Sequence, residues 1–334
     1  MRAPAFWQET GIGCALLAPL AGLYGWAAAV RMRRPGSSAG VPVICVGNPT
    51  LGGAGKTPAA LAIGRFLLEA GERPFFLSRG YGGHARGPLV VDPRQHGAAE
   101  VGDEPLLLAR IAPTVVARAR PAGAALACES GASVIVMDDG LQNPSLAKDF
   151  AVLVLDGRRG IGNARVFPAG PLRAPLQIQL ERAQAMIAVG EIAAAASVLA
   201  KAEALGIPVF RGRLEPHPQA LAALAGKNVL AFAGIADPQK FFATLADRGI
   251  RIGSRRGFAD HHRYSAKDAA RLLAEADRHG LVPVTTEKDL ARISGDPRIA
   301  ALAARAQVVP VELMLDREAE FQGLVLSAVR NQGS

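Results

Sequence analysis

Hydrophobic residues in this chain fall into short unbroken runs that alternate with longer amphipathic stretches. The runs at residues 41–46 and 134–137 are apolar at successive positions, which is typical of strands buried on both faces of a parallel sheet. Residues 57–70 instead place their apolar side chains on one side of a helix. Because strand and helix alternate throughout, the pattern predicts right-handed crossovers and a doubly wound, mainly parallel α/β sheet.

The predicted elements form two series. The first series adds strands at residues 75–77 and 151–155 and helices at residues 104–111 and 122–130. The segment 214–219 contains two prolines and indicates a domain boundary. The second series predicts a smaller α/β domain, with strands at residues 229–233, 250–253, 282–285 and 308–311 and helices at residues 238–248 and 265–279. We therefore expect a helical N-terminal segment over residues 1–38, a main domain over 39–213 and a smaller domain over 214–334.

The N-terminal segment raises the question of a membrane. Residues 10–30 contain no charged side chain and are followed by a basic cluster of Arg31, Arg33 and Arg34. The length suits a transmembrane helix, but glycines and a proline interrupt the segment. A signal peptide fits less well, because the basic start and the cleavage site are both poorly developed. Three interpretations remain, namely a helix on the membrane surface, a single span with a cytoplasmic body, and a buried helix.

Composition narrows the class of protein. The 334 residues are 50% hydrophobic and 20% charged, which is a globular composition of about two domains and excludes a disordered or collagen-like chain. Cys14, Cys45 and Cys128 are far apart, which argues against a disulfide framework or a structural zinc site. The net charge of +9 predicts an anionic partner. Nucleic acid is the least favoured, because no basic and aromatic interleaving or known reading motif is present.

A glycine-rich sequence at residues 46–57 lies between a predicted buried strand and a predicted helix. That context is typical of a phosphate-binding P-loop, in which backbone amides and a helix N-terminus surround phosphate oxygens. Lys56 would reach the β- and γ-phosphates, and the hydroxyl of Thr57 would bind Mg²⁺. The usual pattern has a glycine where this chain has Thr50, so a glycine-rich packing turn is the alternative. We predict that ATP is bound by Thr50, Leu51, Gly52, Gly53, Ala54, Gly55, Lys56 and Thr57.

Two carboxylates, Asp138 and Asp139, follow the apolar run at residues 134–137. Ligands bind at the carboxyl ends of the strands in open α/β sheets, and a carboxylate there can hold Mg²⁺ directly or through water. The alternative is a pair that caps a helix or a turn. Together with Thr57, these acids form the predicted metal site.

A proton acceptor for phosphoryl transfer is expected among acids and histidines grouped with glycine or proline. Asp103 lies in Gly-Asp-Glu-Pro, and residues 258–264 hold two of the six histidines, one of them His261. A helix cap and a solvated loop are the respective alternatives. Three arginines in glycine- or proline-marked loops, Arg79, Arg120 and Arg173, suit phosphate recognition, although simple surface exposure would explain them equally well.

Taken together, seven short motifs resemble the tetraacyldisaccharide 4′-kinases, the lipid A 4′-kinases of Gram-negative bacteria. They occur in the family's order over nearly the whole chain, as Gly-Gly-Ala-Gly-Lys-Thr-Pro, Ser-Arg-Gly-Tyr-Gly-Gly, Gly-Asp-Glu-Pro, Asp-Asp-Gly-Leu-Gln, Pro-Ala-Gly-Pro-Leu-Arg, Phe-Ala-Asp-His-His and Thr-Glu-Lys-Asp. The resemblance implies transfer of the ATP γ-phosphate to the 4′-hydroxyl of a tetraacylated glucosamine disaccharide 1-phosphate in lipid A biosynthesis. It also implies a two-domain P-loop kinase at the cytoplasmic face of the inner membrane.

The resemblance also implies roles for single residues. Asp103 is expected to be the catalytic carboxylate, with His261 of the second domain as its partner and Lys56 on the transferred phosphate. Asp138 and Asp139 are expected to organise Mg²⁺ and the nucleotide. The acceptor side is expected to be lined by Arg79, Tyr81, Arg120, Gln142 and Arg173.

Three positions depart from the family pattern, which usually reads Asp-Asp-Gly-Phe-Gln-His and Leu-Arg-Glu-Pro. This chain has Leu141, Asn143 and Ala174 instead, so an imidazole and a carboxylate are missing on the acceptor side. None of the three belongs to the predicted phosphate machinery.

The expected cofactors are ATP and Mg²⁺, and the expected partners are the acylated disaccharide phosphate and the membrane surface. No obligate protein partner and no nucleic acid are expected. The alternative class is a membrane-associated regulatory P-loop NTPase that acts on a protein partner. Guanine specificity usually shows as an Asn/Thr-Lys-x-Asp motif, and the Thr-Glu-Lys-Asp at residues 286–289 has its lysine one place later.

Overall fold

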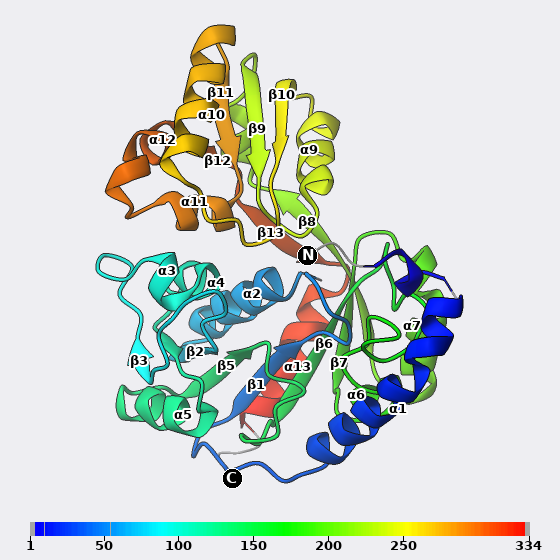
Figure 1. The fold of residues 1–334 in the computed structure, drawn as a ribbon. Helices are drawn as coiled ribbons and strands as arrows, with labels where there is room; N and C mark the ends of the chain where they lie inside the picture. Colours follow the sequence, from blue (N-terminus) through cyan, green and yellow to red (C-terminus); the bar gives the residue numbers. More distant parts are fainter. Residues whose placement is uncertain (1–3, 10, 54, 331–334) are drawn as a thin grey trace.

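The structure, a computed structural model, describes residues 4–9, 11–53 and 55–330 and contains two β-sheets (Figure 1). The larger sheet has the strand order β13-β8-β7-β6-β1-β5-β2-β4-β3. It is parallel except at its edges, where β13 pairs antiparallel with β8 and β3 with β4. Its strands are β1 (Val43–Gly47), β2 (Pro74–Ser78), β3 (Leu89–Val90), β4 (Thr114–Val116), β5 (Val134–Asp138), β6 (Phe150–Asp156), β7 (Ala185–Val189), β8 (Val209–Pro216) and β13 (Val311–Leu315). The predicted doubly wound sheet is confirmed.

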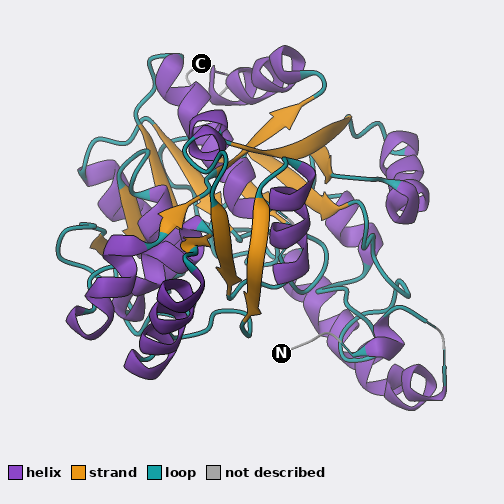
Figure 2. Ribbon diagram, turned by 90° about the horizontal axis from the view of Figure 1, so that it is seen from above, coloured by secondary structure: helices purple, strands orange, loops and turns teal. Residues whose placement is uncertain are grey.

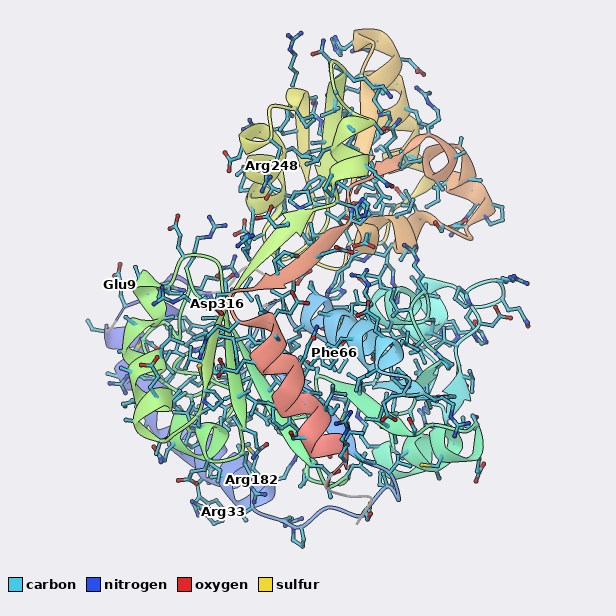
Figure 3. All side chains as sticks on the ribbon, turned by 180° about the vertical axis from the view of Figure 1, so that it is seen from behind. Glu9, Arg33, Phe66, Arg182, Arg248 and Asp316 are labelled. Atoms are coloured by element: carbon cyan, nitrogen blue, oxygen red, sulfur yellow. The ribbon has the colours of Figure 1, made fainter. Side chains whose placement is uncertain are left out.

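Helices cover both faces of the larger sheet (Figure 2). One face carries α2 (Lys56–Glu69), α4 (Asp103–Leu108) and α13 (Glu318–Arg330), and the other carries α5 (Arg120–Glu129), α6 (Leu176–Leu180) and α7 (Ala196–Ala204). Side chains of β1 alternate between the two faces, so that Ile44 and Val46 enter one apolar core and Val43 and Cys45 the other. On the first face, Phe66 of α2 lies beside α13 (Figure 3). Burial on both faces explains why these strands read as unbroken apolar runs.

The smaller domain is built on a four-stranded parallel sheet in the order β10-β9-β11-β12. Its strands are β9 (Asn228–Ala233), β10 (Arg251–Gly257), β11 (Val282–Thr285) and β12 (Gln307–Val308). Its helices are α8 (Pro218–Ala222), α9 (Pro238–Asp247), α10 (Ala266–His279), α11 (Glu287–Ile293) and α12 (Ala300–Arg305). The smaller domain also contains the 3₁₀ turn η3 (Pro297–Ile299), and short elements elsewhere are α3 (Ala98–Val101) and the 3₁₀ turns η1 (Ala5–Trp7) and η2 (Ala193–Ala195). Figure 1 shows α11 on the side of this domain that faces α3 and α4.

The division between the domains differs from the expected one at residue 214. Strand β8 continues through that position to Pro216, and β13 and α13 return the chain to the larger sheet. Residues 217–310 therefore form an insertion between two neighbouring antiparallel strands, β8 and β13, which connect the domains (Figure 1). Strand β8 is second from the edge of the larger sheet, and buried and exposed side chains are interspersed along it, so it lacks the apolar run that marks the central strands.

The strand expected at residues 308–311 is two strands in the structure. Strand β12 ends at Val308 in the smaller sheet, and β13 begins at Val311 in the larger sheet. Pro310 lies between them and lacks the N–H that would continue a ladder. The elements β7, α7 and α13 were not predicted from the sequence at all.

Helix α1 (Ile12–Met32) lies along the larger domain with one face against it. Its inner face packs on residues 163–175, where a Cβ on Gly25 would meet Pro175 and Val166 at 3.6 Å. The opposite face is apolar and exposed, with Leu16 74% and Trp26 66% accessible. The interpretation of α1 as a buried helix is therefore wrong. Among the described residues, α1 is the one helix long and apolar enough to cross a bilayer.

Candidate active site

The loop between β1 and α2 folds over the N-terminus of α2. Its last residue before the helix, Gly55, has φ +87°, a left-handed conformation that favours glycine. The fully buried Asn48 fixes the start of the loop, because its amide donates to the carbonyls of Thr50 at 2.6 Å and Gly52 at 3.1 Å. The first N–H groups of a helix have no partner within it, so those of α2 are available to an anion. Of the predicted nucleotide-binding run, Ala54 lies outside the described residues.

Lys56 and Thr57 form the first turn of α2 and are both buried. The ammonium of Lys56 donates to Oδ1 of Asn48 at 3.0 Å and lies 3.7 Å from Oδ2 of Asp139. Asn48 was not predicted as a functional residue. Its position directly after the central strand is the sequence signal that could have identified it. The structure therefore brings the predicted lysine and one predicted acid together at the phosphate loop.

Asp138 ends β5, the strand that pairs with β1, and both of its carboxylate oxygens are buried without a hydrogen-bond partner among the described residues. Burial raises the pKa of Asp138 to about 7, and the negative charge of Glu104 adds to the shift. A buried carboxylate without a partner is costly, and a bound cation removes that cost. Asp138 and the Thr57 hydroxyl are donors of the kind that Mg²⁺ takes alongside phosphate oxygens and water. The residues present therefore fit Mg²⁺.

Asp139 is placed differently from Asp138. It has φ +56°, and its Oδ1 accepts from the guanidinium of Arg173 at 2.7 Å. Burial alone would raise the pKa of Asp139, but Lys56 and Arg173 hold it below its usual range. Arg173 also donates to the carbonyl of Thr50 at 3.0 Å. Asp139 therefore neutralises cations around the loop, and its predicted contact with the metal stays a prediction.

Gln142 supports the phosphate loop from the same side. Its amide nitrogen donates to the carbonyl of Asn48 at 3.0 Å and to Oε1 of Gln179 at 2.8 Å. Gln142 and Arg173 were both expected on the acceptor side. In the described contacts, both side chains donate to backbone carbonyls of the phosphate loop, so both stabilise the loop. Their contact with an acceptor stays a prediction.

Asp103 begins α4 and is 3% exposed, and His261 of the smaller domain approaches it. The Nδ1 atom of His261 lies 3.5 Å from Oδ2 of Asp103. The histidine has φ +55°, and its backbone N–H donates to the carbonyl of Gly234 at 3.0 Å. The structure thus joins the two residues that the sequence placed in different domains.

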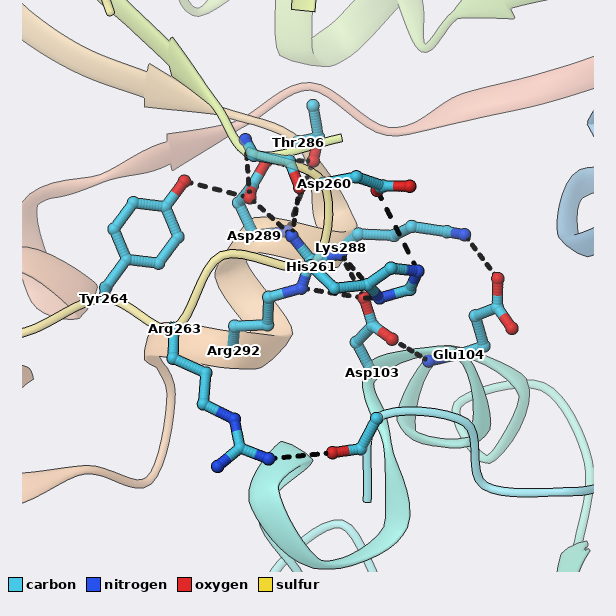
Figure 4. Close-up of polar contacts among 12 residues, drawn as sticks. Asp103, Glu104, Asp260, His261, Arg263, Tyr264, Thr286, Lys288, Asp289 and Arg292 are labelled. Atoms are coloured by element: carbon cyan, nitrogen blue, oxygen red, sulfur yellow. Dashed lines mark hydrogen bonds and ion pairs between the residues drawn. The ribbon is translucent and has the colours of Figure 1, made fainter. Parts of the chain in front are cut away.

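Two residues of α11 complete this cluster (Figure 4). Nε of Arg292 donates to Oδ2 of Asp103 at 2.8 Å, and Nζ of Lys288 lies 2.6 Å from Oε1 of Glu104. Burial alone would raise the pKa of Asp103, but His261, Arg292 and Lys288 hold it well below its usual range. Arg292 was not predicted, although it lies one helical turn after the lysine of the Thr-Glu-Lys-Asp motif.

The remaining predicted acceptor residues differ in how far they are exposed. Tyr81 is 65% exposed, and its ring meets that of His261 edge-on, with centroids 5.0 Å apart. Arg79 is exposed at the end of β2. Arg120 is buried, donates to the carbonyl of Ala117 at 3.0 Å and leaves its Nε without a partner in the part of the chain described. Of these three residues, Tyr81 is therefore the one that directly contacts the Asp103–His261 pair.

The three departures from the family pattern have plain structural roles. Leu141 is buried against Gly47 in the core beneath the loop. Asn143 accepts from the N–H of Ser145 at 2.9 Å and so closes a turn. Ala174 is fully buried and offers no polar side chain. No charged group at these positions faces the phosphate loop.

A doubly wound sheet with a phosphate loop at the head of α2 and a buried acid at the end of the neighbouring strand defines a P-loop nucleoside triphosphate enzyme. The model of the tetraacyldisaccharide-1-P 4′-kinase family matches residues 14–330. The chain belongs to this family.

Individual relatives agree with the family model. The chain is 55% identical to the tetraacyldisaccharide 4′-kinase of Rhodopseudomonas palustris strain BisA53, covering 98% of this chain and 96% of the relative. It is 57% identical to that of Methylobacterium nodulans, over 94% and 91%. Among solved structures, LpxK from Aquifex aeolicus in complex with ATP is similar, with a TM-score of 0.72, 26% identity and coverage of 95% and 99%.

Proposed function

We propose that this chain transfers the γ-phosphoryl group of ATP to the 4′-hydroxyl of a tetraacylated glucosamine disaccharide 1-phosphate, a step of lipid A biosynthesis. Membership of the 4′-kinase family supports the reaction and the class of acceptor. The observation that carries the proposal is the assembly of Asp103 and His261 from two domains. The neighbouring Glu104 is close enough to Lys56 and Asp138 for their charges to interact, which supports a single site. A nucleotide switch that acts on a protein would not need a buried carboxylate paired with a histidine next to the loop.

The nucleotide half of the site uses charge and backbone dipoles. The N-terminus of α2 and the loop amides would hold the β-phosphate, and Lys56 would turn from Asn48 towards the γ-phosphate. Asp138 and Thr57 would hold Mg²⁺, which supplies neutralisation of charge on the β- and γ-phosphate oxygens. These groups lower the barrier by stabilising charge that develops as the phosphoryl group moves.

The acceptor half of the site uses Asp103. Its depressed pKa keeps it a carboxylate at neutral pH, so it can accept the proton of the 4′-hydroxyl as the new O–P bond forms. The bond between the γ-phosphorus and the bridging oxygen breaks, and ADP leaves with the electron pair. His261 lies against the same carboxylate oxygen and orients it. We assign Tyr81, Arg79 and Arg120 to the acceptor side as part of the same proposal.

We further propose that the chain works at the cytoplasmic face of the inner membrane. An acceptor with four acyl chains stays in the bilayer, so the enzyme must bring its site to the surface. The exposed apolar face of α1 is formed by Ile12, Leu16, Leu20, Leu23, Trp26 and Val30. The inner face of α1 is packed on the body and buries Cys14, Ala21, Gly25 and Met32. This two-faced packing supports a helix on the membrane surface rather than a span surrounded by lipid.

The direct test is phosphorylation of a defined tetraacylated disaccharide 1-phosphate by the full chain with ATP and Mg²⁺. We expect one phosphate per acceptor on the 4′-oxygen, located by mass spectrometry and NMR, and ATP turnover that depends on the acceptor. A 4′-deoxy analogue is the matched control and should accept no phosphate. Turnover without an acceptor, or phosphate on another hydroxyl, would contradict the proposal.

A further inference from the structure

Helix α11 begins within the Thr-Glu-Lys-Asp sequence, with Thr286 as its N-cap, and the proposed function assigns this sequence no role. Its Lys288 and Arg292 lie one turn apart and both point at the start of α4 in the larger domain (Figure 4). Lys288 contacts Glu104, and Arg292 contacts Asp103 through both Nε and a terminal nitrogen. Two neighbouring carboxylates of one domain therefore meet two cations of the other.

The guanidinium of Arg292 is fixed by its own domain before it reaches Asp103. Its other terminal nitrogen donates to the carbonyl of Gly234 at 2.6 Å and to Oδ1 of Asp289 at 3.0 Å. The side chains of Arg292 and Asp289 are 7% and 0% exposed. Asp289 is itself held by the hydroxyl of Tyr264 at 2.9 Å and by the N–H of Gly234 at 2.9 Å. The orientation of Arg292 is thus set without help from the larger domain.

The carbonyl of Gly234 also links Arg292 to His261. Gly234 accepts from the N–H of His261 at 3.0 Å as well as from Arg292. A terminal nitrogen of Arg292 lies 3.5 Å from Nδ1 of His261, and both residues face Oδ2 of Asp103. A rigid group of the smaller domain therefore presents an imidazole and a guanidinium together to one carboxylate oxygen.

We propose that Arg292 is a positioning residue that fixes Asp103 and His261 relative to each other across the two domains, with the Lys288–Glu104 pair holding the domains in this arrangement. The proposal rests on the proposed function, because it concerns the group that accepts the hydroxyl proton. The domains are joined through β8 and β13, so α11 supplies a second attachment on the side of the site. Arg292 gains and loses no proton in the reaction.

The chemistry explains why a guanidinium suits this place. A buried carboxylate tends to take up a proton, which would disable it as an acceptor. The groups that face Asp103 are Arg292 and Lys288 from α11, His261 from the loop before α10, and Glu104 from α4 itself. The planar fork of an arginine also fixes the direction of the carboxylate, which the single ammonium of a lysine does not.

The test compares Arg292→Ala and Arg292→Lys with the wild-type chain in the lipid phosphorylation assay. We expect kcat to fall about 10²-fold in Arg292→Ala, because small displacements of reacting groups cost this much, with little change in the KM for ATP. Loss of the positive charge raises the pKa of Asp103, so the acidic limb of the pH–rate profile should move to higher pH. In Arg292→Lys the charge remains, so the limb should stay in place while kcat falls.

Chemical rescue separates positioning from support of the fold. Added guanidinium ion should restore part of the kcat of Arg292→Ala, and sodium chloride at equal ionic strength should not. Arg263→Ala is the matched control, because Arg263 also crosses between the domains but donates to the carbonyl of Gly82 rather than to a carboxylate. That variant should show neither a shifted limb nor rescue.

An unshifted limb and no rescue in a folded Arg292→Ala protein would overturn the proposal. If Arg292→Ala does not fold, the unchanged kcat of a folded Arg292→Lys protein would overturn it equally. Failure of the proposed function gives a different result, namely that the wild-type chain itself phosphorylates no acylated disaccharide.

Discussion

The phosphate loop and the Asp103–His261 cluster are the two halves of the proposed site, but the chain builds them in different ways. The loop is contiguous in sequence and lies between β1 and α2, so the strand, the glycines and the lysine are neighbours along the chain. The cluster joins residues as far apart as Asp103 and Arg292, which are 189 positions apart. Local geometry therefore determines the nucleotide half, and the contact between domains determines the acceptor half. Substitutions in the first half should affect every use of ATP, whereas substitutions in the second should affect transfer selectively.

Outside the Asp103–His261 pair itself, the largest effect is expected in the nucleotide half. Lys56→Ala removes the charge that would neutralise the migrating phosphoryl group, so kcat should fall about 10²–10³-fold. The fold should remain, because Asn48, the partner of Lys56, keeps its two bonds to the loop backbone. Steady-state kinetics and thermal unfolding measure both quantities. Turnover close to the wild-type value in a folded protein would show that the loop is not the nucleotide site.

A smaller effect is expected at the membrane face, where neither half of the site is touched. A variant with Leu16→Ser, Leu20→Ser and Leu23→Ser removes three exposed apolar side chains of α1. Vesicle binding and phosphorylation of bilayer-borne acceptor should both fall at least about tenfold, since each leucine buried in lipid is worth about 1.5–3 kcal/mol. ATP binding should not change. Leu205→Ser at the exposed end of α7 is the control, and an equal loss in that variant would contradict a specific role for α1.

The acceptor half should also contribute to the free energy of unfolding in a pH-dependent way. Asp103 has a depressed pKa, so its contribution to stability is present above the ordinary pKa of an aspartate and is lost as pH falls through the lower, folded-state pKa. Asp103→Asn should therefore lower the free energy of unfolding by about 1–3 kcal/mol at pH 7, because Arg292 loses one of two carboxylates. The difference from the wild type should shrink below about pH 4. A difference independent of pH, measured by denaturant unfolding, would argue against an ionised Asp103.

The smallest effect is expected for an exposed ion pair between the domains. Arg159 and Asp237 form an ion pair at 3.1 Å, but both side chains are about two-fifths exposed. Exposed pairs of this kind contribute at most about 1 kcal/mol. Arg159→Ala should consequently leave kcat and thermal stability nearly unchanged. A loss as large as that of Arg292→Ala would mean that any contact between the domains, rather than the buried cluster, governs activity.

The same contrast explains what the sequence could predict. The central strands, α2 and the loop were predicted because burial on both faces and glycine chemistry leave local patterns. The pairing of Asp103 with His261 came from the resemblance to a family, since no local pattern joins residues in separate domains. Arg292 was missed for that reason. Strand β8 was missed and β13 was merged with β12, because both strands are only partly buried and lack an apolar run. The sequence also could not show which face of α1 is buried and which is exposed, because that depends on how the helix packs against the larger domain.

The central claim is that Asp103 and His261, brought together by the two domains, act as one unit in phosphoryl transfer. The most direct test is a double-mutant cycle on kcat with Asp103→Ala, His261→Ala and the combined variant, with ATP binding measured in parallel. Removal of a proton acceptor typically costs about 10²–10⁴ in rate. The account predicts that the double variant is little worse than the more damaged single variant, because groups that act together are not additive. Losses that multiply, or single variants that transfer phosphate at the wild-type rate, would contradict it.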